Sequence, residues 1–471
     1  MSIYDTWIYN FLAGTLNTVA WMYILLPCVF IGGIYITFGT GAVQFKRFGY
    51  AMKNTLGKLF HKQEAGEGAV TPLQAVTTAL AATVGTGNIV GTSQAIAMGG
   101  YGAVFWLWMA ALLGMVIKYS EVVLSIRYRE RDANGDWVGG PMYYIQNGLG
   151  KSWKWLAVMF SVLGALAAFG IGNMSQSNSI VGSVTGAVAA LTPGGVNEQT
   201  ALILRWALGI GLAALTALVL FGGIKRIGSV TEKLIPFMSA AYVLMTLIVI
   251  FGNLRGIIPA FGKIFAGAFN PQAVLGGATG YALKECIVWG LRRSAFSNEA
   301  GLGSAPIAHA AAECKTPVDQ GLYGIFEVFM DTLVICTLTA LTIIISGVDI
   351  SFGVKPGSEL ITAAFSTVLG GKFASVFIAI ALALFAYSTI LGWSLYGTRC
   401  VQHMFGIKVS KVYQMIFIVM IVVGSVSSLD FVWDIADTLN GMMAIPNFIA
   451  LFALSPVVFK LTKDYFANVK K

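Results

Sequence analysis

The sequence predicts an all-α integral membrane protein with eleven transmembrane helices. Only 11% of its 471 residues are charged, whereas soluble domains carry about 25%. Apolar residues make up 57% of the chain and form runs near the ~20 residues that a helix needs to cross a bilayer. The basic residues gather in alternate loops, which is typical of successive loops on opposite sides of a membrane.

The spans follow from the apolar runs and the polar segments between them. In chain order they are expected at residues 18–39, 72–98, 103–127, 154–190, 201–222, 233–251, 276–311, 322–346, 372–398, 411–428 and 435–459. The first run has no basic residue before it and no small-residue cleavage pattern after it. We therefore interpret it as a membrane span and not as a signal peptide.

Loop charge predicts the orientation of the chain. The loops on one side hold 21 basic residues and those on the other hold 5. By the positive-inside rule, we expect a cell-membrane protein with its N-terminus outside and its C-terminus in the cytoplasm. The net charge of +9 could indicate a protein that binds nucleic acid, but the gathering of basic residues in alternate loops argues against this. The five cysteines are scattered without a CxxC pattern, which indicates neither a metal site nor a disulfide framework.

The second span is interrupted by glycines. Residues 81–91 read AATVGTGNIVG, and such closely spaced glycines disfavour a continuous helix. A broken helix is tolerated in lipid only where its backbone is buried in protein or lines a watery cavity, so this break is a candidate binding site. The alternative is a packing stripe, which Gly87 and Gly91 fit but Gly85 and Asn88 do not. A phosphate loop is disfavoured because no GK[ST] ending follows.

The seventh span carries a second interruption, FSNEAGLGSAP at residues 296–306. The two breaks lie five spans apart, so their helices cross the membrane in opposite directions. This predicts a five-helix unit at residues 71–252 and an inverted copy at 253–471, with residues 1–70 forming an extra helix and a loop. Inverted repeats that each open on a broken helix are typical of secondary transporters.

The breaks suit a zwitterionic ligand. Free N–H groups at the start of a half-helix favour a carboxylate, and free carbonyls at the end of the preceding one favour a small cation or an ammonium group. In the fourth span, Asn173 and Gln176 are candidates to bind a substrate carboxylate, or else join helices. In the ninth, Ser388 and Thr389 suit a hard cation such as sodium, or else bond back to their own helix. Trp393, one turn on, is a candidate pocket wall or a packing residue.

Charged side chains inside spans are functional candidates by default. Lys118 and Glu121, three residues apart, are expected to neutralise each other. Beside the second break, Arg292 and Arg293 are expected to form structural ion pairs, and Glu299 lies within the break itself.

Glu327 and Asp331 stand one helical turn apart in the eighth span. A structural role is favoured for both over a proton or cation relay. Proton coupling through Glu299, Glu327 or Asp331 is nevertheless kept as an alternative to sodium coupling.

Six motifs cover nearly the whole chain from about residue 70. They are ALAATVGTGNIVG (79–91), GGPMYY (139–144), GIGNM (170–174), FSNEAGLGSAPI (296–307), FAYSTILGW (385–393) and IADTLNGMMAIPN (435–447). In this order they resemble the alanine or glycine:cation symporters. The resemblance implies a leucine-transporter-like fold whose first and sixth core helices are broken, and a symporter, not an enzyme, that imports small neutral amino acids with sodium.

The resemblance also implies the site residues. Sodium is expected at the carbonyls of Ala81, Val84 and Phe385 and the hydroxyls of Ser388 and Thr389. The substrate, alanine or glycine, is expected among Thr86, Gly87, Gln176, Phe296, Ser297, Asn298 and Trp393.

Bulky residues predict a preference for small substrates, since Phe169, Phe296 and Trp393 would crowd the pocket. An amino-acid-gated channel or a sensor is the alternative from another class. It is disfavoured because the sequence has no ring of acidic residues and no filter-like repeat.

Overall fold

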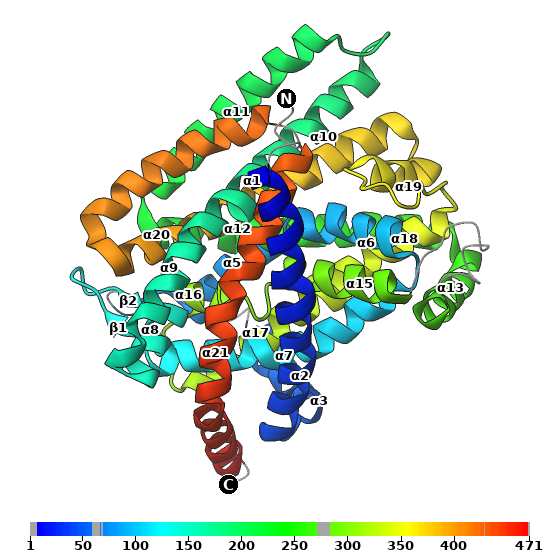
Figure 1. Cartoon of the computed structure of the whole chain (residues 1–471). Helices are drawn as coiled ribbons and strands as arrows, with labels where there is room; N and C mark the ends of the chain where they lie inside the picture. Colours follow the sequence, from blue (N-terminus) through cyan, green and yellow to red (C-terminus); the bar gives the residue numbers. More distant parts are fainter. Residues whose placement is uncertain (1–6, 59–65, 67–68, 271–282, 428, 470–471) are drawn as a thin grey trace.

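The structure, a computed structural model, describes residues 7–58, 66, 69–270, 283–427 and 429–469. Within these ranges the chain is predominantly helical (Figure 1), and the only strands are β1 (Glu130–Arg131) and β2 (Trp137–Val138), which form an antiparallel hairpin. The all-α prediction is confirmed.

The α-helices are, in chain order, α1 (Trp7–Tyr9), α2 (Leu26–Gly39), α3 (Val43–Lys46), α4 (Phe48–Thr55), α5 (Pro72–Thr83), α6 (Thr92–Gly99), α7 (Ala103–Arg127), α8 (Pro141–Tyr144), α9 (Lys154–Phe169), α10 (Ser175–Leu191), α11 (Glu198–Leu220), α12 (Gly223–Gly252), α13 (Ile257–Phe269), α15 (Leu283–Asn298), α16 (Ala305–His309), α17 (Pro317–Val328), α18 (Thr337–Ser346), α19 (Glu359–Leu369), α20 (Gly371–Val426) and α21 (Leu429–Val469). The π-helical segments are η2 (Asn10–Leu16), η3 (Val19–Leu25), η5 (Gly87–Gly91), η6 (Ile145–Leu149), η8 (Gly170–Met174) and η10 (Phe329–Cys336). Single 3₁₀ turns are η4 (Leu56–Lys58), η7 (Lys151–Trp153) and η9 (Leu254–Gly256).

Eight helical stretches in the described part of the chain are long and apolar enough to cross a membrane. Two further predicted spans, 72–98 and 276–311, are broken into halves too short to count, and residues 276–282 lie outside the described residues. The predicted spans 372–398 and 411–428 run together in α20, where Gly406 (φ 80°) makes a kink. The number of eleven crossings stays a prediction.

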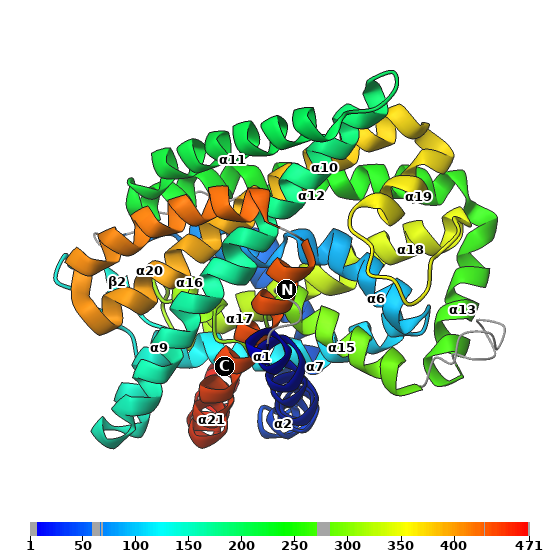
Figure 2. The same cartoon turned by 45° about the horizontal axis from the view of Figure 1, so that its top comes forward.

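Large apolar side chains lie exposed on the outer helices, as expected for a surface that lipid covers. Ile258 on α13 is 84% exposed and Phe237 on α12 is 66% exposed. Figures 1 and 2 show α2 and α21 extending together from one edge of the molecule, while α11 runs along the later part of α20 at another edge. The two broken helices, α5–η5–α6 and α15–α16, lie between these edges in the interior.

The first broken helix starts at a well-formed cap, which fixes where α5 begins. The Gln74 N–H donates to the Thr71 hydroxyl (3.0 Å), and the Thr71 N–H donates to the Gln74 side-chain oxygen (3.2 Å). Pro72 occupies the first turn, where its missing N–H costs no helical hydrogen bond.

Candidate functional site

The first break releases a backbone carbonyl. The helix α5 ends at Thr83, and Val84 leaves the helical region with φ −77° and ψ 87°. The Gly85 N–H would continue the helix by donating to the Ala81 carbonyl, but it donates to Oδ1 of Asn88 instead (2.8 Å). The Ala81 carbonyl therefore lies at a helix end without its helical partner.

The second break depends on left-handed backbone. Glu299 (φ 57°), Gly301 (φ 90°) and Gly303 (φ 77°) all have positive φ, which glycine adopts without strain and glutamate rarely adopts. The side chain of Asn298 supports this turn, because its Oδ1 accepts the Ala300 N–H (2.9 Å).

The two breaks touch each other. A Cβ added to Gly87 would lie 3.1 Å from Cα of Ser297 and 3.4 Å from Cδ1 of Phe296. A side chain at this position would require its neighbours to shift, so glycine suits this close approach of the two backbones. The site thus joins two segments more than 200 residues apart in the sequence.

The hydroxyl pair predicted to bind sodium lies beside the first break. A Cβ on Gly85 would lie 2.3 Å from Oγ1 of Thr389, and both hydroxyls of the pair donate to the Phe385 carbonyl, at 2.8 Å from Ser388 and 3.1 Å from Thr389. The back-bonding considered from the sequence is therefore present. It uses the hydroxyl protons and leaves oxygen lone pairs for a cation.

Close packing of α20 on α5 holds the hydroxyl pair there. A Cβ on Gly392 would lie 2.7–2.9 Å from the Cβ, N and Cα atoms of Ala82. The residue next to Ala81 is thus in backbone contact with the helix that carries Ser388 and Thr389.

One of the predicted substrate residues presents an unused polar group. The Thr86 hydroxyl is buried and has no hydrogen-bond partner in the described part of the chain. The Thr86 N–H points to Oε1 of Gln176 at 3.4 Å, and the Gln176 Nε2 donates to the Ile171 carbonyl (2.8 Å). Of the two polar candidates in the fourth span, Gln176 reaches the break, whereas Asn173 donates to the Phe417 carbonyl (2.6 Å) and joins two helices.

The remaining predicted substrate residues differ in what they can offer. Trp393 is buried, and its indole N–H donates to Glu299 (2.6 Å), so only its ring is available to a ligand. Asn298 uses its amide N–H groups on Ser294 and Thr332, both at 3.1 Å. It shapes the break and has no spare donor for a substrate.

Phe169 does not lie with this group. Its ring packs against Tyr413 (4.9 Å between ring centroids) and Phe417 (6.0 Å), both in the later part of α20.

Asp331 is a residue that sequence reasoning placed in a structural role, and the structure puts it between the two breaks. Its carboxylate accepts Asn88 Nδ2 (2.6 Å) from the first break, and the hydroxyls of Ser297 (2.9 Å) and Thr332 (2.7 Å). No basic side chain of the described residues lies within ion-pair distance of it. A buried carboxylate without a counter-charge is costly.

The buried charges Lys118 and Glu121 have partners other than those predicted. Lys118 pairs with Glu327 (3.3 Å), while Glu121 accepts hydrogen bonds from Asn447 (2.5 Å) and the Gly303 N–H (3.2 Å). The expected pairing of Lys118 with Glu121 is therefore wrong, because each meets a partner on a different helix.

The expected structural ion pairs of Arg292 and Arg293 are confirmed. Both reach the carboxylate of Asp437, at 2.6 Å and 3.3 Å.

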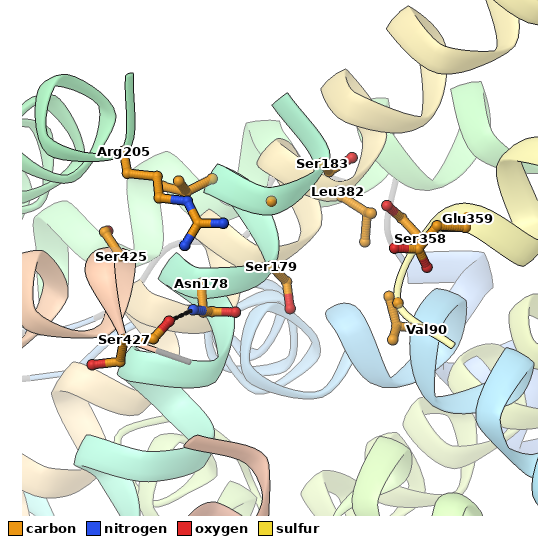
Figure 3. A pocket seen from close by; sticks show the side chains of 13 residues that line it. Val90, Asn178, Ser179, Ser183, Arg205, Ser358, Glu359, Leu382, Ser425 and Ser427 are labelled. Carbon is orange, nitrogen blue, oxygen red and sulfur yellow. Dashed lines mark hydrogen bonds between the residues drawn. The ribbon is translucent and has the colours of Figure 1, made fainter. Parts of the chain in front are cut away.

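A pocket of about 370 Å³ lies beside the first broken helix (Figure 3). Val90 of the first broken helix lines it, together with Asn178 and Ser179 of α10, Arg205 of α11 and Glu359 of α19. None of the predicted substrate residues lines this pocket, and all of them are buried.

The loop that carries the β-hairpin is bound to α20. Asp132 accepts Arg399 Nη1 (3.1 Å) and Gln402 Nε2 (2.8 Å) from α20. Burial alone would raise the pKa of Asp132, but these groups and two backbone N–H donors hold that pKa below its ordinary value. The Asp132 carboxylate therefore stays charged, and its contacts hold the loop against α20.

Two broken helices that meet inside an all-helical membrane protein, with unpartnered polar groups at the junction, define a secondary transporter. The sequence pattern of the sodium:alanine symporter family matches residues 6–471. The chain belongs to this family. It is a sodium-coupled amino acid symporter and not an enzyme.

Individual relatives are similar in sequence over nearly the whole length of this chain. The sodium/alanine symporter AgcS of Methanococcus maripaludis is 43% identical over 458 residues, covering 96% of each chain. The amino-acid carrier protein AlsT of Bacillus subtilis is 37% identical over 465 residues, covering 97% of this chain and 92% of that one. The crystal structure of MhsT in complex with L-phenylalanine has a TM-score of 0.58 at 16% identity, covering 84% of this chain and 99% of that one. This likeness shows the leucine-transporter-like fold.

Proposed function

We propose that the protein imports small neutral amino acids, alanine or glycine, together with sodium by alternating access. The observation that carries the proposal is the contact of the two breaks at Gly87 and Ser297, where the Thr86 hydroxyl is buried without a partner. The chain would lie in the cell membrane with its N-terminus outside and its C-terminus in the cytoplasm. Residues 71–252 and 253–471 would form the two repeats, and residues 1–70 an accessory helix and loop.

Sodium would bind between α5 and α20. The ligands would be the carbonyls of Ala81, Val84 and Phe385 and the hydroxyls of Ser388 and Thr389. All five are oxygen atoms, which hard cations prefer. The contacts of Gly85 with Thr389 and of Gly392 with Ala82 support this assignment because they bring both helices together at that point.

The amino acid would lie along the junction of the breaks. The N–H groups and hydroxyl around Thr86 and Gly87, with Gln176, would hold its carboxylate, since helix starts favour anions. Phe296 and the ring of Trp393 would enclose its side chain, and Ser297 and Asn298 would shape the second break. The close approach of the two backbones leaves room for a small side chain only.

Asp331 would balance positive charge in the bound state. Its carboxylate touches Asn88 and Ser297, one from each broken helix, and a buried ionised acid in a membrane requires a cation or a proton. In this role it would face the substrate ammonium group or a cation.

Uptake of radiolabelled alanine into proteoliposomes tests the proposal. An inward sodium gradient is expected to drive accumulation, and Ser388→Ala is expected to abolish the response to sodium. Uptake that follows a proton gradient, ignores sodium and survives Ser388→Ala would establish the proton-coupled alternative.

Trp393→Ala is expected to admit larger amino acids. Removing the buried ring opens space beside the second break, so leucine should compete with alanine at least about tenfold better, the gain expected for ~1.4 kcal/mol of new apolar contact. Competition against alanine uptake measures this change.

Two matched variants accompany that experiment. Trp393→Phe keeps a ring and should keep the narrow range, and Trp155→Ala removes a tryptophan that is 59% exposed and should change nothing. An unaltered substrate range in Trp393→Ala would place this residue outside the pocket.

A further inference from the structure

A groove of about 1170 Å³ lies between the end of α2, the turn into α3 and the last turns of α21. Both helices extend from the same edge of the molecule in Figures 1 and 2. None of the residues that line the groove belongs to the two breaks, so the groove is separate from the predicted transport site.

Aromatic contacts join α2 and α4 to α21 near the groove. On one side the Tyr35 ring lies 5.5 Å from that of Phe459, and on the other the hydroxyls of Tyr50 and Tyr465 are 3.0 Å apart. Between these contacts the chain leaves α2 through Gly41 (φ 68°) and the following left-handed residue.

Basic and apolar side chains line the groove together. Lys46, Arg47, Lys460 and Lys463 line it, and Asp464 is the one acidic residue among its lining residues. Among the described residues, no acidic side chain lies within 4.0 Å of any of the three lysine ammonium groups.

Phenylalanine rings also line the groove. Phe38, the residue before the last of α2, is 80% exposed, and Phe459 lies opposite it on α21. Apolar rings followed directly by basic side chains are the pattern of a bilayer interface, where acyl chains end and headgroups begin.

We propose that this groove binds an anionic phospholipid of the cytoplasmic leaflet. The phosphate of the headgroup lies among Lys46, Lys460 and Lys463, and the acyl chains lie against Phe38 and Phe459. Basic pockets between membrane helices on the cytoplasmic side favour such headgroups, and each nearby lysine contributes about a fivefold gain in binding. The lipid connects the N-terminal helix to the last helix, both of which flank the transport core.

Native mass spectrometry of the full-length protein tests the site. The protein is taken from vesicles of equal parts phosphatidylcholine and phosphatidylglycerol, and the retained lipids are counted. We expect phosphatidylglycerol to be retained at least about tenfold over phosphatidylcholine. The triple variant Lys46→Gln/Lys460→Gln/Lys463→Gln should lose this preference, and Lys460→Gln alone should reduce it about fivefold if the triple variant fails to fold.

The matched control removes the same charge elsewhere on the same face. The triple variant Lys225→Gln/Lys408→Gln/Lys411→Gln should retain phosphatidylglycerol as the unaltered protein does. Equal retention of both lipids by the unaltered protein, or equal loss in both triple variants, overturns the proposal. Displacement by soluble glycerol phosphate overturns it as well, because it shows an anion site that needs no lipid.

Discussion

Gly392→Ala is expected to weaken sodium activation of uptake by at least about tenfold. The added Cβ would lie within 3 Å of the Cβ, N and Cα atoms of Ala82. Backbone atoms of α5 cannot rotate away, so α5 and α20 must separate. Overpacking of this kind costs about 1–3 kcal/mol, and here the strain moves the carbonyl of Ala81 away from Ser388 and Thr389.

The measurement is the sodium concentration that gives half-maximal alanine uptake. Gly186→Ala in α10 is the control, because a Cβ there meets no atom within 4 Å. A Gly392→Ala protein with unchanged sodium dependence would show that the packing of α20 on α5 does not form the cation site.

Asp331→Asn is expected to reduce alanine uptake about 100-fold or to background. The asparagine keeps the size and the hydrogen-bonding position but removes the negative charge. Removing one partner of a buried pair of charges costs several kcal/mol of interaction free energy, here between the protein and the bound cation or ammonium group. If the carboxyl carried a permanent proton, the amide would replace it with little effect. Uptake near the unaltered rate would therefore exclude the charge-balancing role.

The control for this variant is Asp434→Asn. Asp434 pairs with Lys355 (3.1 Å) at a partly exposed position, where an ion pair contributes little. Alanine uptake by the Asp434→Asn protein should stay close to that of the unaltered protein.

The sequence was most informative about the backbone. Closely spaced glycines at 85, 87, 301 and 303 disfavour a continuous helix, and in the structure they stand at the two breaks. The length of the apolar runs, the charge of the loops and the positions of the glycines are local properties of the chain. The all-α membrane class and the broken helices could therefore be predicted from them.

Side-chain partners were less predictable. The spacing of Lys118 and Glu121 permits a pair, but it does not exclude stronger partners on other helices, and Glu327 and Asn447 provide those. Asp331 follows Glu327 by four residues, which suggests one shared environment. The helix α17 ends at Val328 and continues as the π-helical segment η10, so the helical period does not give the relative directions of these two acids.

Equilibrium binding of alanine to the purified protein, measured at increasing sodium concentrations, tests the central claim most directly. The account predicts that the alanine Kd falls as sodium rises, that the sodium Kd falls by the same factor as alanine rises, and that Thr389→Ala loses this coupling. An alanine Kd that does not change with sodium in the unaltered protein would contradict it.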